Sequence, residues 1–114
     1  MSKKIAIAID AMGGDNSPDK TIKGIKLFLE KNKKNNDFIL NIFGKEDIVT
    51  EKIKENNINT DKIRIFNCDK VVSNDETALT AVKNSKNSSM WNSIQHQLNG
   101  DSDISLSAGN TGVL

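Results

Sequence analysis

The sequence has few of the residues on which several classes of protein depend, namely cysteine, histidine and an excess of basic side chains. Its 114 residues include one cysteine, Cys68, and one histidine, His96. A single cysteine cannot build an internal disulfide framework, and one cysteine with one histidine cannot supply a Cys/His zinc site within the chain. The 16 basic and 15 acidic residues leave a net charge of +1. This balance argues against a nucleic-acid-binding protein, because that class needs a strong basic excess.

Long apolar runs are absent as well. The clearest run, Ile5 to Ile9, ends at Asp10 and is shorter than the roughly 7–15 residues of a secretory signal core. No stretch approaches the ~18 apolar residues of a membrane-spanning helix. We therefore expect a cytoplasmic protein. The apolar fraction is 36%, yet 14 isoleucines place the chain among globular proteins rather than disordered ones.

The apolar residues that are present alternate between a strand pattern and a helix pattern. Short β-branched runs predict strands, and apolar spacings of three and four predict helices. The expected strands are 4–10, 38–43, 63–67 and 103–106, and the expected helices are 18–33, 46–56, 77–86 and 88–98. This βαβαβαβ order is typical of a layered α/β fold with a parallel sheet and helical crossovers.

Ligands of open parallel sheets bind at the carboxyl ends of the strands. We therefore expect four loops to share one edge of the sheet, namely 10–17, 44–46, 68–76 and 107–112. At the end of the first of them, Ser17-Pro18 predicts a helix start, with Ser17 as the N-cap and Pro18 at the first helical position.

The loop that follows the first strand contains adjacent glycines and two aspartates. Gly13 and Gly14 let a ligand approach the backbone, and the helix that follows presents free N–H groups to an anion. Asp10 and Asp15 would repel a bare phosphate unless they face elsewhere or hold a cation or an amide. The loop fits neither G-x-G-x-x-G nor G-x-x-x-x-G-K-[ST]. The alternative interpretation is a tight turn in which Asp10 accepts hydrogen bonds from local N–H groups.

Two further segments carry candidate groups. Residues 107–112 read Ser-Ala-Gly-Asn-Thr-Gly after a predicted strand, so their N–H groups and hydroxyls could surround an anion. A helix N-terminal turn is the alternative there. Ser88 and Ser89 are also candidates, although either could simply cap the following helix.

Three isolated residues receive structural interpretations. His96 has no nucleophile near it in sequence and is expected to be a solvated helix residue. Cys68 is expected to be a small buried hydrophobic residue, and Trp91 is expected to lie in the core.

Taken together, three segments resemble the signatures of the bacterial phosphate acyltransferases of phospholipid synthesis, the PlsX family. They occur in the family's order and are Ile7 to Asp15 with Pro18, Asn87 to Met90, and Ser107 to Gly112. One departure is Asn16, which stands where the family usually has histidine, so no acid–base role is assigned there. Family members are about three times longer, and we expect this chain to be the amino-terminal portion of such an enzyme.

The resemblance implies a Rossmann-like fold of the isocitrate/isopropylmalate dehydrogenase type. It also implies transfer of a fatty acyl group from acyl carrier protein to inorganic phosphate, with no cofactor or metal. A homodimer and peripheral contact with a membrane are further implications. The residues implied in binding phosphate or the oxyanion and in orienting the site are Asp10, Gly13, Gly14, Asp15, Ser88, Ser89, Gly109, Asn110, Thr111 and Gly112.

Two other functions stay open at this point. The strand, glycine loop and helix at the start of the chain are also compatible with a nucleotide-binding α/β domain, although the missing fingerprint argues against it. The end of the chain at Leu114, in an apolar stretch, is compatible with a non-catalytic fragment that keeps the fold.

Overall fold

The computed structural model describes residues 4–13, 17–68 and 88–107. Its elements in chain order are β1 (Ile5–Asp10), α1 (Asp19–Lys31), β2 (Phe38–Gly44), α2 (Glu46–Glu55), β3 (Ile63–Asn67), α4 (Ser89–Leu98) and β4 (Ile104–Leu106). These elements confirm the predicted order at nearly the predicted bounds. The helix expected at 77–86 lies outside the described residues.

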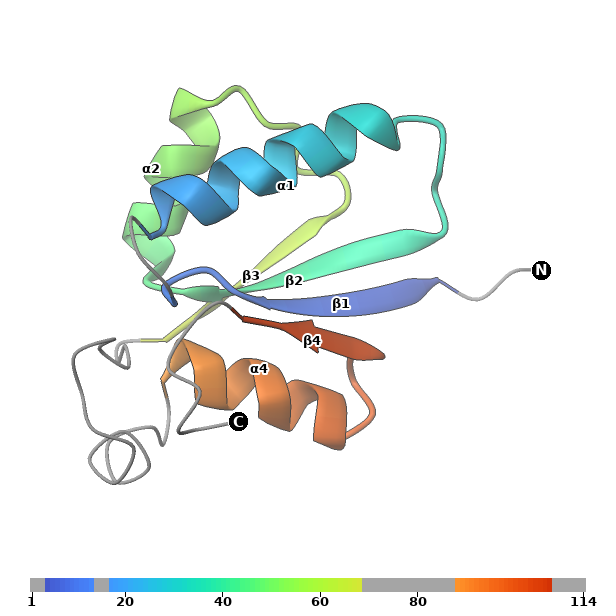
Figure 1. Ribbon diagram of the computed structural model, residues 1–114, viewed down its shortest axis with the longest axis vertical. Helices are drawn as coiled ribbons and strands as arrows, with labels where there is room; N and C mark the ends of the chain where they lie inside the picture. Colours follow the sequence, from blue (N-terminus) through green and yellow to red (C-terminus); the bar gives the residue numbers. More distant parts are fainter. Residues whose placement is uncertain (1–3, 14–16, 69–87, 108–114) are drawn as a thin grey trace.

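The strands form one parallel sheet in the order β3-β2-β1-β4. Strand β1 therefore lies in the interior of the sheet, paired with β2 from Ile5↔Phe38 onward and with β4 at Ile9↔Leu106. Helices α1 and α2 cover one face, and α4 covers the other (Figure 1). This is the Rossmann-like α/β arrangement that the sequence predicts. The more specific comparison with isocitrate/isopropylmalate dehydrogenases stays a prediction.

The face under α1 and α2 holds the larger core. Its fully or nearly buried members are Ile9, Ala11, Ile22, Ile25, Phe38, Leu40, Ile42, Val49 and Ile53. Alternate residues of β2 supply this face because successive strand side chains point to opposite sides. Complete burial of one such isoleucine stabilises the fold by about 1.5–3 kcal/mol, so this cluster fixes α1 and α2 on the sheet.

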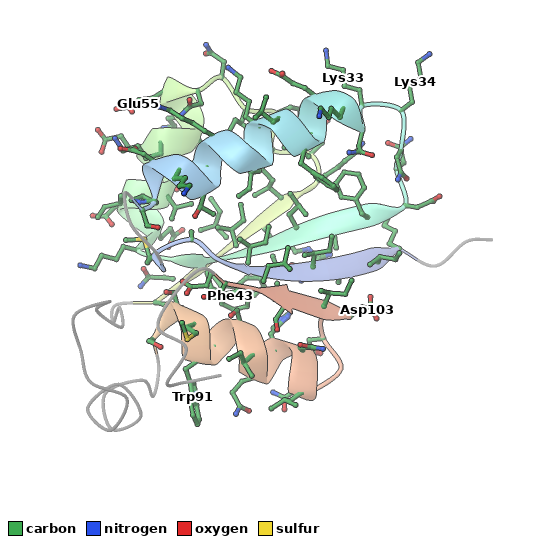
Figure 2. The ribbon with its side chains drawn as sticks, viewed as in Figure 1. Lys33, Lys34, Phe43, Glu55, Trp91 and Asp103 are labelled. Carbon is green, nitrogen blue, oxygen red and sulfur yellow. The ribbon has the colours of Figure 1, made fainter. Side chains whose placement is uncertain are left out.

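The face under α4 has a smaller apolar cluster of Ala8, Phe43 and Cys68, with Phe66 packed against it, and α4 brings small polar groups to it. Helix α4 buries Ser89, Met90 and Ser93, and the two serines are four residues apart, on one side of the helix. Trp91 follows Ser89 by two residues, is only partly buried and points away from the sheet (Figure 2). The expectation that Trp91 lies in the core is therefore wrong, because the small serines determine which side of α4 faces the strands.

His96 is also placed differently from the expectation of a solvated residue. Its ring packs against Phe43 and Phe66, with centroid distances of 5.2 and 5.1 Å. Its Nδ1 lies 2.6 Å from Oγ of Ser102, and that hydroxyl accepts a hydrogen bond from Nδ2 of the buried Asn41 at 2.9 Å. This chain of polar contacts links β2 to α4 inside the fold.

The start of α1 differs from the sequence prediction. The helix begins at Asp19, and Pro18 occupies the N-cap position without a side-chain cap. Ser17 is not the N-cap because its hydroxyl donates a hydrogen bond to the carbonyl of Gly13, on the loop side. Ser17 therefore fastens the glycine loop to the helix start.

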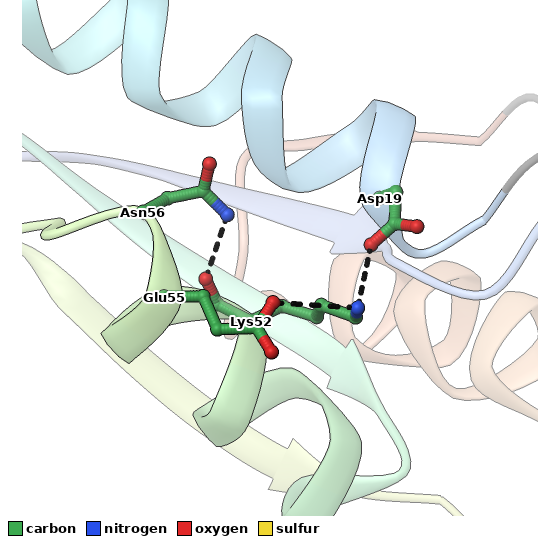
Figure 3. Close-up of polar contacts among 4 residues, drawn as sticks. All are labelled: Asp19, Lys52, Glu55 and Asn56. Atoms are coloured by element: carbon green, nitrogen blue, oxygen red, sulfur yellow. Dashed lines mark hydrogen bonds and ion pairs between the residues drawn. The ribbon is translucent and has the colours of Figure 1, made fainter.

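A surface ion pair connects α1 to α2 (Figure 3). Nζ of Lys52 lies 3.1 Å from Asp19 of α1 and 3.4 Å from Glu55 of its own helix. The hydrogen bond with Asp19 is the main cause that raises the pKa of Lys52, with the charge of Asp19 and contacts with Glu55 adding to it. Nδ2 of Asn56 donates to the Lys52 carbonyl at 2.8 Å and closes the end of α2.

One isoleucine in the core and one at the surface allow a direct test of which residues form the core. Ile42 is fully buried in β2, whereas Ile5 is 49% exposed at the start of β1. We expect Ile42→Val to lower the free energy of unfolding by about 0.5–1.5 kcal/mol. The matched control Ile5→Val should change it by less than about 0.5 kcal/mol. Urea denaturation measures both, and equal losses would contradict this assignment of the core.

Candidate functional site

The candidate site centres on Asp10, the last residue of β1, which is 3% exposed. Its Oδ1 accepts hydrogen bonds from the backbone N–H groups of Met12 and Gly13, each at 3.1 Å. The interpretation of Asp10 as an acceptor for local N–H groups is therefore confirmed. These bonds turn the chain sharply at the end of the strand and hold the first glycine of the loop in place.

Asp10 also accepts hydrogen bonds from two distant segments. Oγ of Ser89, the first residue of α4, donates to Oδ1 at 2.5 Å. Oγ of Ser107, just after β4, donates to Oδ2 at 2.7 Å. The sheet explains the second contact, because the register Ile9↔Leu106 places the next residues of β1 and β4 side by side. One carboxylate thus joins the three sequence segments that resemble family signatures.

The two adjacent serines have separate tasks. Ser88 is the N-cap of α4, and its Oγ accepts a hydrogen bond from the N–H of Trp91 at 3.1 Å. The capping interpretation is thus confirmed for Ser88. Ser89 turns its hydroxyl to Asp10 and brings that carboxylate to the positive end of the α4 dipole, where a negative charge is stabilised. Both serines are buried.

The hydrogen bonds of Asp10 bear on the predicted repulsion between this carboxylate and an anion. The aspartate charge at the sheet edge faces inward and is satisfied by four donors, two N–H groups and two hydroxyls. The expected repulsion between Asp10 and a bound phosphate is therefore reduced. A carboxylate saturated in this manner is suited to holding loops in position rather than to accepting a proton from a substrate.

Six of the proposed site residues cannot be placed, because they lie outside the described residues. They are Gly14, Asp15, Gly109, Asn110, Thr111 and Gly112. The structure does bring Asp10, Gly13 and Ser89 together. Ser107 was recognised in sequence as a hydroxyl of its loop but was not assigned to the site. The order of the strands is the information that would have assigned it.

An apolar cavity of about 380 Å³ opens beside this polar cluster, between α1 and strands β1 and β4. This cavity was not predicted from the sequence. Its lining consists of Ile7, Ile9, Asp10, Thr21, Gly24, Ile25, Phe28, Leu40, Leu106 and Ser107. Asp10 and Ser107 stand at the carboxyl ends of their strands, so the polar groups of the lining lie toward the sheet edge and the apolar side chains continue away from it.

Other kinds of site find no support in the part of the chain that the structure describes. Within residues 4–13, 17–68 and 88–107, no three metal-ligating side chains of the His, Cys, Asp or Glu type come together. No helix in these ranges is both long enough and apolar enough to cross a membrane. Cys68 is buried as expected, and its Sγ accepts a hydrogen bond from Nδ2 of Asn92 at 3.1 Å.

Comparison with known proteins identifies the family of this chain. A family model described as "Fatty acid synthesis protein" matches residues 5–114. The chain belongs to this fatty acid synthesis protein family. The resemblance inferred from the three segments is confirmed, since curated relatives bear the name phosphate acyltransferase.

Three of these relatives show how much of the family's chain is covered. The phosphate acyltransferase of Pelagibacter ubique is 42% identical over 114 residues, which is 100% of this chain and 33% of that protein. That of Oenococcus oeni is 39% identical over 114 residues, again 100% of this chain and 31% of the relative. That of Caldicellulosiruptor bescii is 36% identical over 108 residues, covering 95% and 31%. The chain thus spans about a third of the length of the curated relatives it matches.

Substitution of Asp10 tests its place in this member of the fatty acid synthesis protein family. Asp10→Ala removes the acceptor of two N–H groups and two hydroxyls, and each buried unsatisfied donor costs about 1–3 kcal/mol. We expect the free energy of unfolding to fall by about 3 kcal/mol or more. Asp10→Asn should lose less, because its Oδ1 keeps three donors and its amide donates to Ser107.

Urea denaturation with a far-UV signal measures these losses. Asp61→Ala, which removes an exposed carboxylate, is the control and should change stability by less than about 0.5 kcal/mol. An Asp10→Ala variant as stable as the unmodified chain would refute the role assigned to the carboxylate.

Proposed function

We propose that this chain forms the loop-bearing sheet edge of a phosphate acyltransferase. In the reaction, a fatty acyl group moves from acyl carrier protein to inorganic phosphate and gives acyl phosphate. The observation that supports the proposal is the carboxylate of Asp10, which gathers the glycine loop, the start of α4 and the end of β4 at one place. Family membership and the names of the relatives agree with it.

This transfer depends on placing the phosphate against the thioester and does not require a covalent intermediate with the protein. A phosphate oxygen attacks the thioester carbonyl carbon, the carbon–sulfur bond breaks, and the carrier leaves as a thiol after gaining a proton. Negative charge develops on the carbonyl oxygen, where preorganised N–H and hydroxyl donors stabilise it. Holding phosphate and thioester together removes much of the entropic cost of their encounter.

We assign the donors to the loop that begins at Ser107. In this proposal Gly109, Asn110, Thr111 and Gly112 bind phosphate or the oxyanion. What supports this assignment is Ser107, which precedes these residues in the chain and whose hydroxyl donates a hydrogen bond to Asp10 at the end of β4.

The glycine loop of β1 completes the proposed site from the other side. Gly13 and Gly14 let the acyl phosphate approach the backbone, and Asp15 helps to orient the site. Asp10 is a positioning residue, since its four hydrogen bonds leave it engaged with the protein. Ser89 positions Asp10 in turn.

The partners follow from the same proposal. Acyl carrier protein and inorganic phosphate are the substrates, and a homodimer with peripheral membrane contact fits an enzyme that delivers an amphiphilic product. Neither a metal nor a cofactor is needed for this displacement. The proposal leaves nucleotide binding as the competing function, which tight binding of NAD(H) or ATP in a titration would favour.

A chimera tests the activity. We propose replacing the matching third of the Pelagibacter ubique relative by this chain, since the two are 42% identical over 114 residues. The chimera should form acyl phosphate from acyl carrier protein thioester and phosphate, detected by trapping with hydroxylamine. A folded chimera without product would refute the proposed function. The unmodified relative serves as the positive control.

The 114-residue chain alone should be inactive in the same assay. The relatives are about three times longer, and a site without its remaining walls admits water and loses oxyanion stabilisation. Turnover by the isolated chain above the rate without protein would contradict this expectation.

A further inference from the structure

The apolar cavity beside Asp10 is a groove with one polar end. Its volume of about 380 Å³ lies within the roughly 300–1,000 Å³ of small-molecule sites. Ile7, Ile25 and Leu40 form part of its apolar wall, whereas Asp10 and Ser107 belong both to the lining and to the candidate site. The groove and the site are therefore continuous.

A glycine in the middle of α1, Gly24, lines this groove. Among the residues that the structure describes, a Cβ at Gly24 would meet no atom within 4 Å. Glycine within a helix costs about 0.5–1 kcal/mol relative to alanine. Within the described part of the chain, no turn or close contact at Gly24 accounts for that cost, since Gly24 lies between Asp19 and Lys31 of a regular helix.

Large apolar side chains on both sides of the groove are partly open to solvent. Phe28 of α1 is 40% exposed, and Leu106 of β4 is 54% exposed. Both line the cavity. Their exposed surface is available to an apolar occupant, and its burial would be favourable at about 25 cal/mol per Å².

We propose that this groove holds the fatty acyl chain of the substrate, with the reacting carbonyl end toward Asp10 and Ser107. The inference rests on the proposed function. It adds the residues that limit the length of the acyl chain that can bind. An acyl thioester or acyl phosphate has one polar end and an apolar, flexible remainder. The groove has the same division, with its polar groups at the sheet edge where the signature loops begin.

In this assignment, Gly24 and Phe28 limit the chain length that fits. They lie four residues apart on α1, on the side that lines the groove. Because α1 runs antiparallel to the strands, Gly24 lies nearer the polar end and Phe28 lies farther along. A side chain added at position 24 should therefore block the path of longer acyl chains while leaving the polar end unchanged.

Binding of alkylphosphonates to the 114-residue chain tests the groove without requiring activity. Octyl-, decyl- and dodecylphosphonate, each below its micelle concentration, carry a phosphate-like head and an increasing tail. The affinity of the unmodified chain should rise up to about fourfold for each methylene that enters the groove. In Gly24→Leu, we expect the dodecyl compound to lose about tenfold or more in affinity and the octyl compound to lose less.

Lys23→Leu is the matched control. It places the same side chain on the neighbouring exposed residue of α1, outside the cavity lining, and should leave all three affinities unchanged. Thermal denaturation of both variants establishes that they fold. A photoreactive diazirine at the tail end should label peptides containing α1 or β4.

Several results would overturn the inference. Equal affinity for the three lengths, equal losses in both leucine variants, or labelling away from α1 and β4 would each do so. A dimer that Gly24→Leu abolishes and Lys23→Leu preserves would show that a second copy of the chain fills the groove. The Gly24→Leu substitution can also be made in the chimera. If that variant forms acyl phosphate normally and keeps the same chain-length preference, another segment of the protein covers the groove.

The chimera also separates this inference from the proposed function. A chimera that makes acyl phosphate while Gly24→Leu binds every tail normally refutes the groove alone. The opposite combination refutes the proposed function alone. In that case the 114-residue chain binds the alkyl tails in the groove, but the folded chimera makes no acyl phosphate.

Discussion

The buried carboxylate of Asp10 is the constraint on which the described site depends. A charged group removed from water must be hydrogen-bonded or its burial is very costly, and Asp10 is 3% exposed. Its partners Ser89 and Ser107 are 79 and 97 residues away in sequence. The need to satisfy one charge therefore fixes the start of α4 and the end of β4 against the glycine loop.

The two faces of the sheet divide the remaining tasks. The face under α1 and α2 contributes most of the apolar core, with Ile22 and Ile42 fully buried. The face under α4 combines a smaller apolar cluster around Phe43 with buried serines of α4, of which Ser89 donates to Asp10 from the start of the helix. Met90 and the contacts of His96 hold that helix in register.

Within the described residues, the sequence was sufficient for the order of the helices and strands and for the meeting of residues 10 and 107 at one sheet edge, because short β-branched runs and apolar helix spacings are local signals. It was insufficient for residues whose placement depends on distant partners. Trp91 was expected inside because it is large and apolar, yet two serines determine the buried side of α4. His96 was expected in solvent because nothing near it in sequence indicates the rings of Phe43 and Phe66. Ser107 needed the strand order before it could be paired with Asp10.

The groove also could not be predicted from local sequence signals, because its lining comes from segments far apart in the chain. It connects the fold to the proposed chemistry. Its walls come from β1, β2, β4 and α1, and Gly24 adds no side chain to the lining. Acyl transfer requires that a long apolar chain and a small anion meet at one carbonyl carbon. In the proposed site, Asp10 would serve both needs from a single position, because the same carboxylate accepts a hydrogen bond from Ser107 and lines the groove. In this proposal, the hydrogen bonds of Asp10 would hold the two subsites at a fixed distance and so position the reactants.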